Sequence, residues 1–134
     1  MVEKHSDQAD DGRALFARLA GEEYCYVTTT GRISGRPHEI EIWFGLNGNS
    51  LYLLSGGGDT SDWVKNLRKT PTVLVRIASH TFSGAARLVE DKQEEQMAQY
   101  MLAGKYQGWR EGRKLSGWAR TALPVAIDLT VERL

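Results

Sequence analysis

The stretch that decides the fold runs from His38 to Leu54 and reads HEIEIWFGLNGNSLYLL. Its first nine residues alternate between an apolar face that starts with a histidine and a polar face that includes one tryptophan. The first face holds His38, Ile40, Ile42, Phe44 and Leu46, and the second holds Glu39, Glu41, Trp43 and Gly45. A period of two residues predicts a strand with one buried face. The tripeptide 47–49, Asn-Gly-Asn, predicts a hairpin turn, because both residue types tolerate positive φ, and residues 51–54 return as the next strand.

The segments on either side of this hairpin complete a small β-rich fold. Further strands are predicted over residues 24–30, 72–77, 81–89 and 125–131, which are rich in β-branched and aromatic residues. Helices are predicted from Asp10 or Asp11 to near Gly21, between Asp59 and Pro71, and over 91–103. Six strands with a short helix after the third predict a mainly β (α+β) fold, a six-stranded antiparallel barrel that leaves few exposed edges.

Composition indicates a single globular domain over residues 1–134, with residues 1–9 expected to be frayed. The chain has 17 basic and 17 acidic residues, a balance that argues against nucleic acid as a partner. No apolar run reaches the ~18 residues of a membrane helix, and the polar N-terminus is unlike a signal peptide, so we expect a cytoplasmic protein with no transmembrane segment. One cysteine and three scattered histidines show no metal-ligand spacing, so no metal is expected.

The glycine-bounded turn at residues 30–36, TGRISGR, is the first candidate site. Arg32 and Arg36, with Ser34 and free backbone N–H groups, are suited to bind a phosphate. A solvent-exposed hairpin with solubilising arginines explains the same composition, and spacing alone favours that alternative.

The second candidate site is the loop Ser55-Gly56-Gly57-Gly58 and the helix start that follows it at Asp62 and Trp63. Three glycines allow the backbone to approach a planar ring or a phosphate, and a helix N-terminus favours anions. The alternatives are a flexible connector, a tryptophan that packs in the core, and a lysine and an asparagine, Lys65 and Asn66, that are merely solvated.

Aromatic residues mark a third region. Trp43 interrupts the polar face of its strand, so either a second layer covers it, such as a partner subunit or residues 104–122, or it lines a ligand slot. Glu39 and Glu41 share that face and are either an acid/base pair or partners of solvent or an arginine. Residues 104–122 resist assignment, and their Tyr106, Trp109 and Trp118 suggest an aromatic lid over a pocket.

Residues 26–77 resemble the deazaflavin (F420)-dependent nitroreductase family, within the pyridoxamine 5'-phosphate oxidase-like split β-barrels. Six stretches carry the resemblance in order: Thr28–Arg32, Gly35–Pro37, Trp43-Phe44, Leu54–Gly58, Asp62–Leu67 and Pro71–Val73. The resemblance implies an FMN-binding-like split barrel with coenzyme F420 as cofactor and FMN as the alternative. It also implies which residues contact the cofactor: Arg32, Ile33, Ser34, Arg36, His38, Glu39, Ile40, Glu41, Ile42, Trp43, Ser55, Gly56, Gly57, Gly58, Asp62, Trp63, Lys65 and Asn66.

The activity that this resemblance implies is hydride transfer from reduced deazaflavin to a small acceptor such as a quinone, an activated enone or a nitro compound. Ser55 is the candidate donor to negative charge that develops on the acceptor, and Tyr106 and Trp109 are candidate substrate contacts. Three other functions stay open at this point: an FMN-binding oxidoreductase of the same fold, a carrier that binds a cofactor or a haem-like ligand without turnover, and an interaction domain whose pocket is vestigial. The chain is expected to be a monomer or a homodimer.

Overall fold

The computed structural model describes residues 12–130, so the predicted fraying of residues 1–9 lies outside the described part. The described elements after a helix over residues 12–19 are β1 (Cys25–Thr30), β2 (Pro37–Ile42), β3 (Gly45–Asn47), β4 (Ser50–Ser55), the 3-10 helix η1 (Gly58–Thr60), α2 (Asp62–Lys69), β5 (Thr72–Ile77), β6 (His80–Leu88), α3 (Lys92–Gln107), α4 (Gly117–Thr121) and β7 (Leu123–Thr130). The prediction of a mainly β fold with flanking helices is confirmed.

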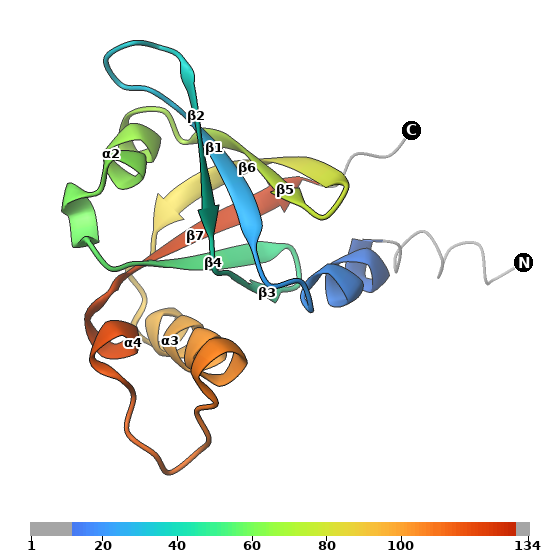
Figure 1. Ribbon diagram of the computed structural model, residues 1–134, viewed down its shortest axis with the longest axis vertical. Helices are drawn as coiled ribbons and strands as arrows, with labels where there is room; N and C mark the ends of the chain where they lie inside the picture. The colour runs from blue at the N-terminus through green and yellow to red at the C-terminus, as the bar shows by residue number, and fades with distance from the viewer. Residues whose placement is uncertain (1–11, 131–134) are drawn as a thin grey trace, which may run out of the picture.

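All described strands belong to one antiparallel sheet with the order β2-β1-β5-β6-β7-β4-β3 (Figure 1). The two strands at the ends of this order, β2 and β3, are consecutive in the chain and are joined only by Trp43 and Phe44. The sheet therefore curls until its two edges meet at this corner, which gives the split barrel that the sequence predicts.

The prediction of a single strand over residues 38–46 is wrong, because β2 and β3 divide this stretch between them. The described part of the chain therefore has seven strands instead of six. The strand is interrupted at Phe44 because the backbone of this residue binds to side chains of α3 and not to a neighbouring strand. The Phe44 N–H donates to the Tyr106 hydroxyl at 3.0 Å, and its carbonyl accepts from Lys105 Nζ at 3.0 Å. Alternation within one strand contains no signal for these contacts, since their partners lie about sixty residues away.

The barrel interior is filled by the inward residues of the strands. Val27, Leu53, Val75 and Ile127 are fully buried there, and the short helix over residues 12–19 adds Phe16, whose ring centroid is 5.2 Å from that of Phe82. Burying such side chains stabilises a fold by about 1.5–3 kcal/mol each. The one cysteine of the chain, Cys25, is free and buried in this core.

A second, smaller core lies between α3 and the sheet, where Ala98 and Leu102 of α3 pack on Tyr52 and Ala126. This packing places α3, α4 and the intervening loop together at one end of the barrel, while α2 covers another part of its rim (Figure 1). Helix α4 lies in the segment that the sequence left unassigned. No helix in the described part of the chain is long and apolar enough to span a membrane.

Candidate functional site

The turn between β1 and β2 is a compact loop held by its own backbone. The Gly31 N–H donates to the Arg36 carbonyl at 2.8 Å, and the Gly35 N–H donates to the Gly31 carbonyl at 2.9 Å. Gly35 has a φ of 73°, a conformation that glycine adopts without strain. The turn therefore presents residues 32–34 in a defined conformation beside the N-terminal half of α2.

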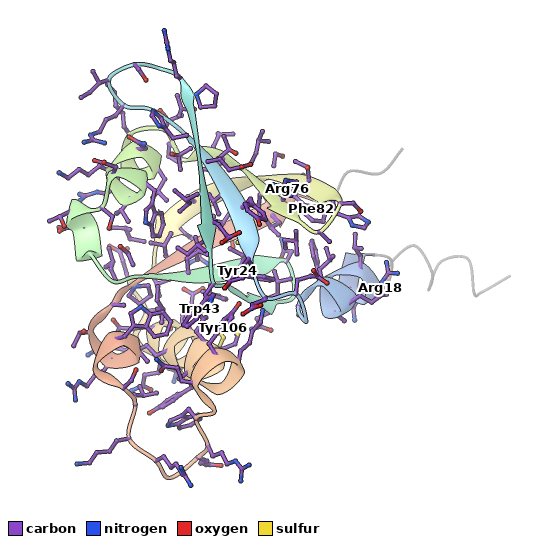
Figure 2. All side chains as sticks on the ribbon, in the orientation of Figure 1. Arg18, Tyr24, Trp43, Arg76, Phe82 and Tyr106 are labelled. Carbon is purple, nitrogen blue, oxygen red and sulfur yellow. The ribbon has the colours of Figure 1, made fainter. Side chains whose placement is uncertain are left out.

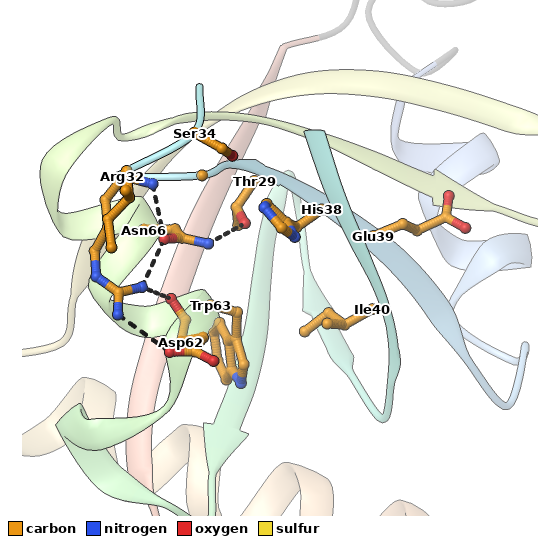
Figure 3. Close-up of a pocket in the computed structure, with 11 residues that line it drawn as sticks. Thr29, Arg32, Ser34, His38, Glu39, Ile40, Asp62, Trp63 and Asn66 are labelled. Carbon is orange, nitrogen blue, oxygen red and sulfur yellow. Dashed lines mark hydrogen bonds and ion pairs between the residues drawn. The ribbon is translucent and has the colours of Figure 1, made fainter. Parts of the chain in front are cut away.

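Asn66 of α2 connects this turn to the barrel. Its side-chain oxygen accepts hydrogen bonds from the Arg32 backbone N–H at 3.1 Å and from Arg32 Nη1 at 2.9 Å, and its Nδ2 donates to Thr29 Oγ1 at 3.2 Å (Figure 3). Asn66 is only 4% exposed, so these bonds satisfy the polar atoms of a buried amide. The interpretation of Asn66 as a merely solvated residue is wrong.

Two further contacts hold Arg32 against α2. Its Nη2 forms an ion pair with Asp62 Oδ1 at 3.2 Å, and its carbonyl accepts from Lys69 Nζ at 3.0 Å. The Arg32 side chain stays 29% exposed, whereas that of Asp62 is 86% exposed. A guanidinium with a fixed orientation is thus presented to solvent at the edge of the turn.

Beside Arg32 lies a cleft of about 480 Å³, which we call the β2–α2 cleft. Its walls come from the β1–β2 turn, the start of β2 and one face of α2, and its lining residues are Thr29, Gly31, Arg32, Ile33, Ser34, His38, Glu39, Ile40, Asp62, Trp63 and Asn66. His38 and Ile40 face Asn66 and Trp63 across it (Figure 3). Among the described strands β2 pairs with β1 alone, so its other edge has backbone groups without a ladder partner.

Gly31 allows the His38 ring to occupy the cleft. A Cβ at position 31 would lie 2.7 Å from both His38 Nε2 and Ser34 Oγ, closer than side chains approach one another. The absence of a side chain at Gly31 therefore permits the close packing of the turn on β2.

A second hollow of about 390 Å³, which we call the aromatic slot, continues along the same strand. Its lining residues are Tyr24, Glu41, Ile42, Trp43, Leu54, Gln107 and Trp118. The rings of Trp43 and Trp118 meet edge to face with centroids 5.5 Å apart. Residues 38–40 of β2 line the cleft and residues 41–43 line the slot, so the two hollows share β2 and its Trp43 corner as one wall.

The carboxylates of Glu39 and Glu41 do not form an acid/base pair in these hollows. Each lies opposite an outward-facing residue of β1, and the Glu39 carboxylate points away from the cleft (Figure 3). Glu39 pairs with Arg76 at 3.7 Å, and Glu41 accepts a hydrogen bond from the Tyr26 hydroxyl. Glu39 thus follows the alternative in which these carboxylates meet an arginine, whereas Glu41 binds a tyrosine hydroxyl that the sequence did not suggest.

The structure brings together most of the residues that the sequence and the resemblance single out for a cofactor. The β2–α2 cleft contains Arg32, Ile33, Ser34, His38, Glu39, Ile40, Asp62, Trp63 and Asn66, and the aromatic slot contains Glu41, Ile42 and Trp43. Arg36 and Lys65 are exposed and line neither hollow. The glycines 56–58 line neither, although a Cβ on Gly56 would lie 3.6 Å from Trp118 Cδ1, so the loop borders the slot indirectly.

Ser55 is not placed where it can donate to an acceptor. It is only 2% exposed, its hydroxyl donates to the Gly58 carbonyl at 2.8 Å, and it lies 3.0 Å from Ser61 Oγ. These bonds fold the glycine loop back on itself. The interpretation of Ser55 as an oxyanion donor is therefore wrong for this arrangement.

Tyr106 and Trp109, the predicted substrate contacts, lie on different sides of the C-terminal region. Tyr106 stacks on Trp43 with ring centroids 4.4 Å apart, behind the aromatic slot and outside its lining (Figure 2). Trp109 stacks on Tyr100 at 4.5 Å and lines a separate hollow of about 760 Å³ on the outer side of α3. Trp43 is thus both covered by residues of the 104–122 segment and exposed to a slot.

Sequence reasoning missed four lining residues of the two hollows, namely Tyr24, Thr29, Leu54 and Gln107. Thr29 and Leu54 lie in the stretches that carry the resemblance. Gln107 comes from a segment without periodicity, and only the density of aromatic residues there pointed to a pocket.

Behind the slot, burial shifts the pKa of three groups. Desolvation lowers the pKa of Lys105 to about 8, against the opposing influence of Cys25 and Glu22. Desolvation also raises the pKa of Tyr106 and of Cys25, each to about 12. Tyr106 and Cys25 therefore stay neutral at physiological pH, whereas Lys105 is close to its titration range.

Solved structures with the same fold identify the class of protein. A conserved hypothetical protein from Mycobacterium tuberculosis aligns with a TM-score of 0.71 at 18% identity, over 86% of this chain and 78% of that one. A protein from Listeria innocua described as a candidate pyridoxamine 5'-phosphate oxidase aligns with a TM-score of 0.66 at 19% identity, over 88% and 92% of the two chains. An F420-H2 dependent reductase aligns with a TM-score of 0.58 at 21% identity, over 81% and 94%. These matches establish the split-barrel fold.

Within this class, the model of the F420H(2)-dependent quinone reductase family matches residues 2–129. The chain belongs to that family. It is an oxidoreductase that depends on the deazaflavin F420, which decides between the two cofactors that the resemblance implied.

Proposed function

We propose that this protein binds reduced F420 along β2 and uses it to reduce a quinone-type acceptor in the aromatic slot. The observation that carries the proposal is that a fixed arginine and a slot lined by two tryptophans lie along the same strand, with a free backbone edge between them. F420 has the matching chemistry, an anionic phosphate-bearing tail joined to a planar ring.

The residues of the β2–α2 cleft fit the anionic part of the cofactor. Arg32 supplies a guanidinium whose orientation is fixed by Asn66, and Ser34 supplies a hydroxyl on the same turn. The space that a Cβ on Gly31 would fill is taken up by His38, which presents a ring nitrogen to the cleft. In this proposal Arg32 and Ser34 bind the phosphate and Trp63 covers the cofactor's apolar part.

The free edge of β2 orients the ring. Backbone N–H and C=O groups along residues 38–43 have no ladder partner on this side among the described strands, and they are available to bind the polar edge of a planar heterocycle. When it is bound, reduced F420 supplies the hydride. The protein's part is to hold the ring against β2 and next to the slot.

The aromatic slot fits a flat, apolar acceptor. Trp43, Trp118 and Tyr24 provide ring surfaces, and Ile42 and Leu54 provide aliphatic ones. Reduction of a quinone to the neutral hydroquinone consumes one hydride and one proton, whereas the hydroquinone monoanion needs the hydride alone. Tyr24 is 38% exposed at the rim, and solvent supplies this proton through this open side.

Binding is tested by titrating the protein with F420 and with FMN and following tryptophan fluorescence, since Trp63 and Trp43 border the proposed site. Arg32→Ala is expected to weaken F420 binding by about 1.5–3 kcal/mol, the usual contribution of a charged hydrogen bond, or roughly tenfold or more. Arg36→Ala on the same turn is the matched control, because Arg36 lies outside the cleft. Equal losses in both variants, or none in Arg32→Ala, would contradict the proposed phosphate position.

Turnover is tested with reduced F420 and a panel of a soluble quinone, an activated enone and a nitro compound. Return of the visible absorbance of oxidised F420 reports hydride transfer. We expect the quinone to be the fastest acceptor. Tight F420 binding with no oxidation by any of the three acceptors would leave a carrier function in place of the proposed reductase activity.

A further inference from the structure

The corner between β2 and β3 is held by two consecutive residues of α3. The Phe44 N–H donates a hydrogen bond to the Tyr106 hydroxyl, and that hydroxyl donates a hydrogen bond to the Glu23 carbonyl at 2.7 Å. The Phe44 carbonyl accepts from Lys105 Nζ, and the ammonium also lies 3.7 Å from the centroid of the Phe44 ring. The buried N–H and carbonyl of Phe44, which have no strand partner, are thus both bonded by side chains.

Tyr106 also supports Trp43 directly, and Lys105 contacts the Tyr106 ring. The Tyr106 ring lies parallel to the Trp43 ring, with an angle of 5° between the planes and 4.4 Å between centroids. Lys105 Nζ lies over the Tyr106 ring, 5.0 Å from its centroid, and forms a cation–π contact with it. Trp43 therefore has Tyr106 stacked on it and also lines the slot.

The cost of this arrangement argues that it serves the slot. Desolvation opposes the charge of Lys105, and the groups that face it are Cys25 of β1, Glu22 of the preceding loop and Tyr106 of its own helix. An apolar residue at position 105 would avoid that cost but would leave the Phe44 carbonyl without this donor. The charged donor Lys105 fixes the conformation of the β2–β3 corner, which contains Trp43 of the slot wall.

We infer that Lys105 and Tyr106 are positioning residues that fix the Trp43 ring as a wall of the aromatic slot and thereby set the affinity for the acceptor. This inference rests on the proposed function. It assigns a role to two residues at the end of α3 that do not themselves line the cleft or the slot.

Steady-state kinetics of three variants with reduced F420 and a soluble quinone test the inference. Tyr106→Leu removes both the stack and the hydroxyl, Tyr106→Phe keeps the stack, and Tyr100→Leu removes a stacked tyrosine on the other side of α3 as the matched control. We expect Tyr106→Leu to raise the KM for the quinone about tenfold, Tyr106→Phe to raise it less, and Tyr100→Leu to leave it unchanged. The Kd for F420, measured by calorimetry, is expected to stay within about twofold in all three.

Lys105→Met and Lys105→Arg supply a second readout. The KM of the wild-type protein for the quinone is expected to rise as the pH passes about 8, where Lys105 loses its charge. Lys105→Met is expected to have the high KM at all pH values. Lys105→Arg is expected to keep the low KM to higher pH. An unchanged KM in folded Tyr106→Leu, or a Kd for F420 that worsens as much as the KM, overturns the inference.

The inference is also testable without turnover, so that its failure is distinguishable from failure of the proposed function. The indole N–H resonance of Trp43, assigned by its loss in Trp43→Phe, is expected to shift in Tyr106→Leu and to stay in place in Tyr100→Leu in the ligand-free protein. A resonance that does not move in Tyr106→Leu overturns the positioning role, whether or not F420 binds.

Discussion

The side-chain oxygen of Asn66 accepts two hydrogen bonds from one residue, Arg32, through its backbone N–H at 3.1 Å and its Nη1 at 2.9 Å. A single buried amide thus determines the position of both the main chain and the charged end of Arg32. The amide nitrogen of Asn66 reaches Thr29 on β1, so that the turn, the helix and the barrel are linked through one side chain.

Asn66→Ala is therefore expected to affect stability and binding together. It leaves the Thr29 hydroxyl and the Arg32 N–H without these partners, and we expect the free energy of unfolding to fall by about 1–3 kcal/mol in urea denaturation. The affinity for F420 is expected to fall as well, because the guanidinium loses its orientation. Asn47→Ala, at an exposed asparagine at the end of β3, is the control. Equal stability losses in the two variants would show that the Asn66 network does not hold the turn.

Asp62→Asn is expected to strengthen F420 binding. The Asp62 carboxylate is 86% exposed and lies 3.2 Å from Arg32 Nη2, where it competes with an incoming phosphate. Asparagine keeps a hydrogen-bond acceptor for Arg32 but removes the charge, and an exposed ion pair of this kind contributes about 0.2–1 kcal/mol. The Kd for F420 is thus expected to fall by up to about fivefold.

This gain is expected to shrink at high salt, since exposed charges are screened. Asp59→Asn, which removes a neighbouring exposed carboxylate on η1, is expected to change the Kd less. Weaker binding in Asp62→Asn would show that the carboxylate contacts the cofactor favourably.

Gly31→Ala is expected to weaken F420 binding more than it lowers stability. The new Cβ would lie 2.7 Å from His38 Nε2 and Ser34 Oγ, and both are ends of side chains that are able to move away. The fold adjusts, but two polar groups leave their places in the cleft. Gly117→Ala is the matched control, because a Cβ there meets nothing within 4 Å. Measured Kd values and unfolding midpoints separate the two effects; a large stability loss with unchanged binding would contradict this expectation.

The cleft was accessible to sequence reasoning because its residues lie on two short stretches of the chain, 29–40 and 62–66. Arg32, His38 and Asn66 lie on short motifs in which glycine, charge and strand alternation are visible without a structure. These motifs do not predict which way each side chain points. Arg36 and Lys65 belong to the same motifs but point outside the cleft, and the hydroxyl of Ser55 is taken by its own loop.

The aromatic slot and the strand break were not accessible in the same way, because long-range contacts create them. The alternation through Phe44 predicts a continuous strand, whereas Lys105 and Tyr106 stop it from about sixty residues away. Trp118 reaches the slot on α4, a helix of five residues in a segment whose glycines and arginines give no helical period. Tertiary packing, and not local propensity, decides the structure of both regions.

Arg87→Met is expected to remove stability that depends on pH. Arg87 of β6 donates to both carboxylate oxygens of Glu94 at 2.8 and 2.7 Å and to Asp128 at 2.8 Å, which ties the start of α3 to the sheet. The hydrogen bonds from Arg87, with one from Tyr52, lower the pKa of Glu94 to about 2 from an ordinary 4.5, and Arg87 also lowers the pKa of Asp128. A carboxyl whose pKa is lowered by folding stabilises the folded state above its unfolded pKa and loses that contribution as the pH falls.

The difference in unfolding free energy between wild type and Arg87→Met is therefore expected to be largest near neutral pH. It narrows as the pH falls from about 4.5 to about 2, where Glu94 becomes protonated in the wild-type fold as well. Urea denaturation across this range measures it, with Arg68→Met on the exposed face of α2 as the control. A difference that stays constant across the range would mean that Arg87 stabilises the fold through the packing of its aliphatic chain, with no contribution from its charge.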